Sequence, residues 1–159
     1  MPASLDVVID AFRPEHAHTF AELNRAWLVA YGLLEPPDVR QLAEPWKLII
    51  VPGGQIFVAL RGAEVVGTCA AVPYQPGAME LAKLAVAPAA QGLGLGRRLV
   101  EACLKFAHES GVRRVVLLSN SRLTAALRLY EGFGFQYRPM PFDLKYATAD
   151  VYMELDFAS

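Results

Sequence analysis

The chain has 159 residues, of which 54% are hydrophobic and 19% are charged, and its formal net charge is −1. This composition is typical of a globular domain with a substantial core and excludes a disordered chain. The small net charge argues against a nucleic-acid partner, and the lack of an apolar run of about 20 residues argues against a membrane span. We therefore expect one domain over residues 1–159, with neither nucleic acid nor membrane as a partner.

The expected compartment follows from the first residues and from the two cysteines. Residues 1–6 lack the basic start and the apolar core of a signal peptide, so we expect a cytoplasmic protein. Cys69 and Cys103 fall in a predicted strand and a predicted helix, where they are expected to be reduced core thiols. No cluster of cysteine and histidine indicates a metal site, and we expect none.

The first third of the chain predicts one strand and two helices. Residues 6–12 are expected to form the strand. Pro14 begins a helix that carries apolar residues at helical spacing and ends at Gly32. A shorter helix is expected from Glu35 to Glu44.

The middle of the chain predicts an antiparallel meander of three strands, over residues 55–60, 65–72 and 79–86. The turn Arg61-Gly-Ala-Glu64 joins the first two as a hairpin. An amphipathic helix follows from Leu95 and stops near Gly111. The next strand, residues 114–119, is reached through this long helix, so it should lie parallel to the third strand of the meander.

The last part of the chain predicts a helix over residues 123–131 and strands at 135–137 and 151–157. Together the elements predict an α/β (α+β) fold. Its central sheet is mixed and mostly antiparallel, has about six to seven strands, and is flanked by helices.

A glycine-rich turn, Gln91-Gly-Leu-Gly94-Leu-Gly96, joins the strand at 79–86 to the long helix. The free amides at such a helix start favour a phosphate or pyrophosphate. A P-loop would need Gly-Lys-Ser/Thr, but Gly96 precedes two arginines. A dinucleotide fold would need a third glycine and a carboxylate after the next strand, which ends in Ser119 and Asn120. Two interpretations remain: the turn binds coenzyme A, or it binds nothing.

Two motifs favour coenzyme A. The segment 91–96 matches the Q/R-x-x-G-x-G/A motif, and Leu129-Tyr130-Glu-Gly-Phe-Gly134-Phe135 resembles the LYxxxGF segment of the GNAT family of N-acetyltransferases. Leu84-Ala-Val86-Ala-Pro88 resembles the strand that enters the pyrophosphate loop of that family. The specific resemblance covers residues 79–135, and upstream only the order of elements agrees.

The resemblance implies a GNAT fold in which acetyl-CoA, the co-substrate, lies between splayed parallel strands at 79–86 and 114–119. Backbone groups of the first strand would pair with the pantetheine arm, and amides of the loop would hold the pyrophosphate. The side chains of Arg97 and Arg98 either meet phosphate or form a solvated face. The implied cofactor-binding residues are Leu84, Ala85, Val86, Gln91, Gly92, Leu93, Gly94, Leu95, Gly96, Arg97 and Asn120.

Tyr130 and Glu80 are the candidate catalytic residues. The resemblance implies that Tyr130 protonates the leaving thiolate, although its helical spacing also suits a core residue. Glu80 occupies a strand position that carries a glutamate base in histone-acetylating members, and its alternative is a solvent-exposed strand end. Alternation predicts that Glu80 shares a face with Ala82, Leu84 and Val86 and that Lys83 faces the other way. Asp150 is the second candidate base.

The acceptor is expected to be an amine, on a small molecule or a peptide. Residues 27–38 and 139–150 are its expected walls. Trp27, Tyr31, Phe142 and Tyr146 would give apolar contacts, and Glu35, Asp38 and Asp143 would attract a cation. A non-catalytic acyl-CoA-binding module of the same fold is the alternative function. The sequence leaves both a monomer and a homodimer open.

Overall fold

The computed structural model describes residues 6–142 and 146–158. Its single sheet has seven strands in the order β1-β2-β3-β4-β5-β7-β6. The pairing of β4 with β5 is parallel and the other pairings are antiparallel, which confirms the predicted mixed sheet. The strands are β1 (Val8–Ala11), β2 (Gln55–Arg61), β3 (Glu64–Pro73), β4 (Ala78–Val86), β5 (Arg114–Ser119), β6 (Gln136–Arg138) and β7 (Val151–Asp156).

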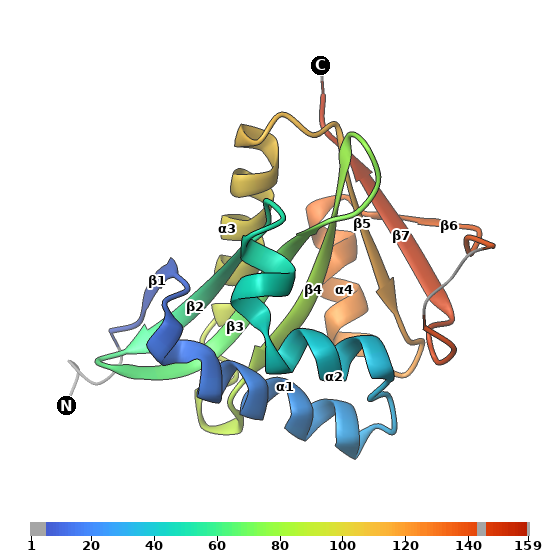
Figure 1. Ribbon diagram of the computed structural model, residues 1–159. Coiled ribbons are helices and arrows are strands. Elements are labelled where there is room, and N and C mark those ends of the chain that lie inside the picture. The colour runs from blue at the N-terminus through green and yellow to red at the C-terminus, as the bar shows by residue number, and fades with distance from the viewer. Residues whose placement is uncertain (1–5, 143–145, 159) are drawn as a thin grey trace.

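In the described residues, four helices cover the sheet, two on each face (Figure 1). They are α1 (Ala17–Ala30), α2 (Pro36–Ala43), α3 (Leu95–Glu109) and α4 (Thr124–Phe133). Short turns occupy η2 (Pro14–His16), η3 (Trp46–Ile50) and η4 (Pro88–Ala90). The four helices confirm the sequence prediction, whereas the π-helical turn of η3 was not predicted. None of the helices described is long and apolar enough to cross a membrane.

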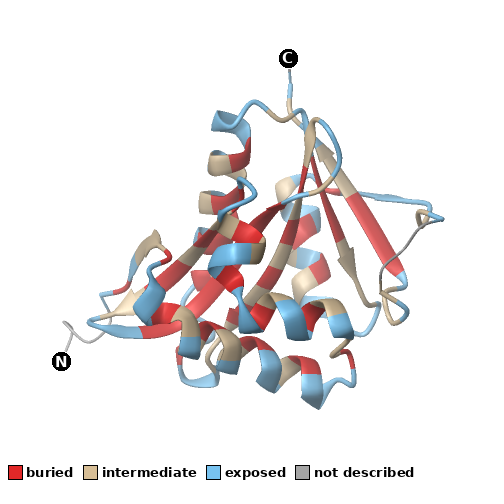
Figure 2. Ribbon diagram, in the orientation of Figure 1, coloured by how far each residue is buried: buried red, intermediate tan, exposed pale blue. Residues whose placement is uncertain are grey.

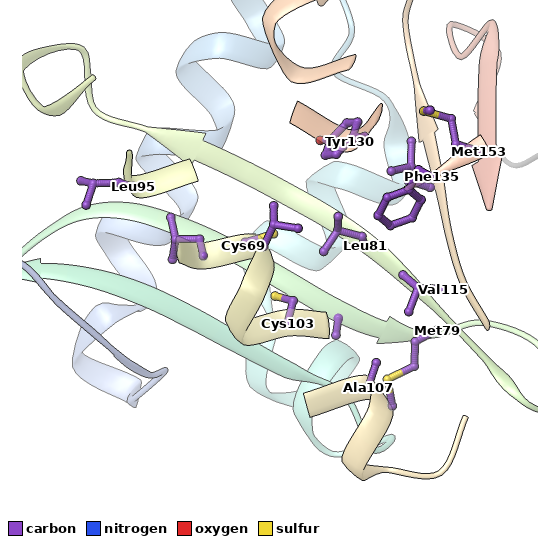
Figure 3. Packing of buried hydrophobic residues seen from close by; sticks show 14 of the residues in the cluster. Cys69, Met79, Leu81, Leu95, Cys103, Ala107, Val115, Tyr130, Phe135 and Met153 are labelled. Carbon is purple, nitrogen blue, oxygen red and sulfur yellow. The ribbon is translucent and has the colours of Figure 1, made fainter. Parts of the chain in front are cut away.

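Two apolar clusters form the core, one on each face of the sheet. Figure 2 shows the buried residues in red along the strands and helices. The cluster between the sheet and α1 and α2 includes Phe20, Ile49 and Ile56. The cluster beneath α3 and α4 includes Leu99 and Tyr130, and Figure 3 shows it from close by. Burial of these side chains provides the main driving force for folding.

The two parallel strands separate after a short contact. β4 pairs with β5 only from Ala78 to Glu80, opposite residues 114–116. β5 remains paired with β7 along its whole length, from Arg114 to Ser119. Beyond Glu80, no described strand pairs with the edge of β4 that faces β5, and the two strands splay apart as the family resemblance implied (Figure 1).

A β-bulge in β4 lies at the splay. Ala70 of β3 pairs with Ala82, but Thr68, two residues away, pairs with Ala85, three residues away. The extra residue in β4 is accommodated where Lys83 has a φ of 58°, in the left-handed region that non-glycine residues rarely occupy.

The bulge overturns the predicted alternation along β4. Ala82 packs into the cluster on the α1 and α2 face, whereas Leu84 and Val86 pack against the cluster on the α3 face. Glu80 pairs with Val72, a member of the α1 and α2 cluster, so it lies on that face. The prediction that Glu80, Leu84 and Val86 share a face is therefore wrong. Lys83 reaches α2, which places it on the same face as Glu80 and corrects the second half of that prediction.

Candidate active site

The glycine-rich turn leads directly into α3, whose N-cap is Gly94, as the sequence indicated. Gly92 and Gly94 have φ values of 84° and 76°, and open space lies where their Cβ atoms would be. The side chain of Gln91 donates a 3.2 Å hydrogen bond from Nε2 to the carbonyl oxygen of Val86, which ties the turn to the end of β4. A helix start has amides without acceptors within the helix. Such amides can hold an anion in the adjoining cavity of about 570 Å³.

Most of the predicted cofactor residues lie in or beside this loop cavity. Its lining includes Val86, Gln91, Gly92, Gly94, Leu95 and Gly96. Leu93 is exposed at the tip of the turn, and Ala85 is buried in the sheet. The guanidinium of Arg97 lies over the ring of Phe133 at 5.2 Å from its centroid, so this side chain packs on the C-terminal end of α4. The backbone amide of Arg97 remains in the first turn of α3.

A second cavity, of about 190 Å³, lies where β4 and β5 separate, and we call it the central cavity. Its lining includes Leu81–Leu84 from β4, Leu118–Asn120 at the end of β5, and Tyr130 from α4. It shares Leu123 and Ala126 with the loop cavity, so the two spaces adjoin. Two of the predicted cofactor-binding residues, Leu84 and Asn120, and both predicted catalytic residues, Tyr130 and Glu80, meet here.

Tyr130 lies at the inner wall of the central cavity and is only 9% exposed. Its ring packs edge to face on Phe135 at a centroid distance of 5.9 Å (Figure 3). Burial raises the pKa of the Tyr130 phenol, and the neighbouring thiols of Cys69 and Cys103 raise it further. The phenol is therefore protonated at neutral pH. Tyr130 belongs to the core cluster and also lines the cavity, so its two predicted interpretations are compatible.

Glu80 lies between the central cavity and a third cavity of about 430 Å³, which we call the outer cavity. The two cavities share Glu80, Leu118 and Tyr146. Arg40 of α2 also lines the outer cavity. Burial raises the pKa of the Tyr146 phenol and the Glu80 carboxylate raises it further, which places these two groups close together.

A buried ion pair in the central cavity was not predicted from the sequence. Lys83 Nζ lies 2.6 Å from Asp38 Oδ1, and 5.9 Å from the ring centroid of Tyr146. The other oxygen of Asp38 accepts a 3.0 Å hydrogen bond from the backbone amide of Glu35. Asp38 therefore has its charge balanced within the protein, unlike the free cation-attracting group that was expected.

Asn120 and Asp150 are held by loop contacts. Asn120 donates from Nδ2 to the carbonyl oxygen of Thr148 at 2.9 Å, and its Oδ1 accepts from the amide of Arg122 at 3.0 Å. The alternative role of Asn120 as a helix cap is wrong, because the N-cap of α4 is Leu123. Asp150 accepts two hydrogen bonds from Ser121, which hold the pKa of its carboxyl below the ordinary value and make it a weak base.

The two expected acceptor walls are joined by Glu35. Its carboxylate accepts hydrogen bonds from the amides of Ala147 and Thr148 at 2.8 and 2.9 Å. Trp27 and Tyr146 line the central cavity. Tyr31 lines the loop cavity instead, and the Phe142 side chain is fully exposed. Asp143 lies outside the described residues.

Comparisons with known proteins identify the family of this chain. A profile of the acetyltransferase (GNAT) family matches residues 12–135. A mycothiol acetyltransferase of Sanguibacter keddieii is 33% identical over 151 residues, which cover 84% of this chain and 45% of that protein. The chain spans about half the length of the curated relatives it matches.

Solved structures share the fold. An acetyltransferase of the GNAT family from Staphylococcus aureus Mu50 has a TM-score of 0.86 at 16% identity, with 95% of this chain and 99% of that chain covered. The structure of yncA from Salmonella typhimurium with its cofactor acetyl-CoA has a TM-score of 0.77 at 22% identity. The match covers 97% of this chain and 95% of that chain. The chain belongs to the GNAT family of acetyltransferases.

Proposed function

We propose that this protein transfers the acetyl group of acetyl-CoA to an amine by direct attack in a ternary complex. The observation that carries the proposal is the row of three adjoining cavities. The loop cavity suits a pyrophosphate, the central cavity brings Tyr130 and Glu80 to the gap between the strands, and the outer cavity opens beyond Glu80. Family membership supports acetyl-CoA as the donor.

In this proposal acetyl-CoA lies along the gap between β4 and β5. Amides of residues 92–97 hold the pyrophosphate at the start of α3. The pantetheine arm pairs with the unpaired edge of β4 at residues 84–86, as an added strand would. Asn120 borders the same gap on the side of β5. The thioester then lies in the central cavity.

The proposed chemistry needs a base, an oxyanion donor and an acid. An alkylammonium acceptor has a pKa near 10 and must lose a proton before attack, and Glu80 takes it directly or through water. The bulge leaves backbone groups of β4 outside the ladder beside the cavity, and an amide there can stabilise the oxyanion. Tyr130 gives its proton to the departing thiolate, and its raised pKa keeps the phenol protonated until the thiolate forms.

The acceptor would enter through the outer cavity, from the side of Glu80 opposite to the glycine turn. Tyr146 and Leu118 border the passage into the central cavity. Small amines and the amino end of a peptide both fit this description of the acceptor. A protein that only binds acyl-CoA is the second candidate, because the loop cavity alone would serve that function.

The test is release of free coenzyme A thiol from acetyl-CoA across a panel of amines, with the wild type and Glu80→Gln. We expect transfer to at least one amine class by the wild type and a large loss of turnover in Glu80→Gln, with coenzyme A affinity retained. Glu64→Gln, an exposed carboxylate at the start of β3, is the matched control. Tight binding of coenzyme A without thiol release for any amine would favour the binding module.

A further inference from the structure

A chain of buried polar groups connects α1 to the bulge in β4. Asn24 Nδ2 donates to Thr68 Oγ1 at 3.0 Å and to the carbonyl oxygen of Phe20 at 2.9 Å. Thr68 Oγ1 in turn donates to the carbonyl oxygen of Lys83 at 2.9 Å. Asn24 and Thr68 are both 0% exposed. The chain therefore ends on the backbone of the one residue that has the left-handed conformation in β4.

Filling the interior with this polar chain costs desolvation free energy. Buried polar groups lose their hydration and contribute little net stability even when they are hydrogen-bonded. Asn24 Oδ1 is also buried and has no partner among the residues described. An apolar pair of the same shape would serve packing equally well. The polar pair needs an explanation other than core packing.

The conformation of Lys83 explains why the buried polar pair is present. A non-glycine residue at φ 58° is strained and persists only where its surroundings fix it. Two separate contacts fix Lys83: Thr68 holds its carbonyl oxygen, and Asp38 holds its ammonium group at 2.6 Å. Without the first contact, the backbone at residue 83 can relax toward the extended region and change the register of β4.

We infer that Thr68 and Asn24 are positioning residues for acetyl transfer, because they hold the bulge that forms the wall of the reaction cavity. The inference rests on the proposed function. Lys83 and Leu84 both line the central cavity, and the bulge determines which face Leu84 takes. Neither Thr68 nor Asn24 lines any of the three cavities, so both act through the backbone of β4.

Thr68→Val tests the inference, since it keeps the shape of the side chain and removes the hydroxyl. Turnover is measured per coenzyme A site, with the sites counted by calorimetric titration, so that unfolded protein does not lower the value. We expect turnover to fall roughly tenfold to a hundredfold, as for a reacting group displaced by about 1 Å, with coenzyme A affinity within about twofold. Thr68→Ser keeps the hydroxyl and should restore turnover.

Val66→Ala is the matched control. Val66 is a buried residue of the same strand and belongs to the α3 cluster, so its truncation weakens the core without touching the polar chain. A merely structural role predicts that both variants lose thermal stability and that neither loses turnover per site. Wild-type turnover per site in Thr68→Val, or an equal loss in Val66→Ala, overturns the inference.

A second variant and a second measurement keep the test decisive. If Thr68→Val yields no folded protein, Asn24→Leu removes the hydrogen bonds of Asn24 to Thr68 and Phe20 and leaves the one from Thr68 to Lys83. We then expect a smaller fall in turnover at unchanged coenzyme A affinity. Hydrogen exchange of the amides at 83–85 should quicken in the polar-chain variants and not in Val66→Ala. Unchanged exchange refutes the positioning role. Failure of the wild type to acetylate any amine refutes the proposed function instead.

Discussion

Lys83 and Asp38 form a buried ion pair between β4 and α2, with both side chains 5% exposed and Nζ 2.6 Å from Oδ1. The two residues are 45 positions apart in the chain. Because the second oxygen of Asp38 accepts the backbone amide of Glu35, the pair also fixes the first turn of α2. One contact thus joins the helix that borders the outer cavity to the bulge that borders the central cavity.

Removal of one partner should cost far more than the pair contributes. Asp38→Ala leaves the Lys83 ammonium buried without a counter-charge, and we expect the free energy of unfolding to fall by about 3–5 kcal/mol. Glu44→Ala is the control, since Glu44 at the end of α2 pairs with Lys47 in solvent and should change stability by less than about 1 kcal/mol. Urea unfolding measures both. Similar small losses in the two variants would contradict a buried pair.

Tyr130→Phe should lower turnover about a hundredfold and leave coenzyme A affinity intact, because the phenol supplies a proton that the benzyl group lacks. Burial raises the pKa of Tyr130, so its protonated form persists above the ordinary value of about 10. The wild-type rate should therefore not fall between pH 8 and about 10 through loss of the Tyr130 proton, so Tyr130→Phe should remove no such fall. Steady-state thiol release over this range measures both effects.

The control for this variant is Tyr137→Phe. Tyr137 is exposed and donates to the carboxylate of Glu131 at 2.6 Å, away from the cavities. The turnover of Tyr137→Phe should match that of the wild type. Unchanged turnover in Tyr130→Phe with a good acceptor would remove Tyr130 from the mechanism.

Gly94→Glu should abolish coenzyme A binding. Gly94 has a φ of 76° and faces open space, so a side chain there is strained and extends into the position expected for the pyrophosphate, with a repelling charge. Gly62→Glu is matched in strain, because Gly62 has a φ of 62° in the β2–β3 turn, also beside open space. We expect calorimetry to show wild-type affinity in Gly62→Glu and none in Gly94→Glu. Equal affinity in both variants would refute the loop assignment.

Local patterns predicted most of the fold. The turn at Gly62, the parallel strands joined through α3 and the glycine-rich start of α3 each follow from residues that are neighbours in the chain. The motifs at 91–96 and 129–135 placed Gly94 and Tyr130 on the elements where the structure has them. These features depend on backbone conformation and spacing, which a single sequence records well.

Contacts between residues that are far apart in the chain could not be predicted from the sequence. Alternation along β4 assumed an unbroken strand, and nothing in the residues themselves marks Lys83 as left-handed. The bulge is fixed by Thr68 and Asp38, which lie 15 and 45 positions away. The sequence therefore predicted that Asp38 would attract a cation of the acceptor, whereas its carboxylate pairs with Lys83. Asn24 had no local signal, since its hydrogen bond to Thr68 exists only after α1 packs on the sheet.

The carboxylate of Glu35 should make stability depend on pH in the acid range. Burial alone would raise the pKa of Glu35, but hydrogen bonds from Thr148 and Ala147 outweigh burial and lower it. A lowered pKa in the folded protein means that the folded state favours the ionised form. Its stabilising contribution is therefore complete above the unfolded pKa of about 4.3 and is lost as the pH falls through the lower folded value.

Glu35→Gln tests this expectation, because the amide keeps the shape and loses the charge. The difference in unfolding free energy between wild type and variant should be constant from about pH 8 to 5 and should shrink below about pH 4. Urea titrations at a series of pH values measure it. Glu64→Gln, at an exposed position, supplies the baseline for loss of one surface carboxylate. A difference that grows as the pH falls would mean that the loop at 147–148 does not stabilise the ionised form of Glu35.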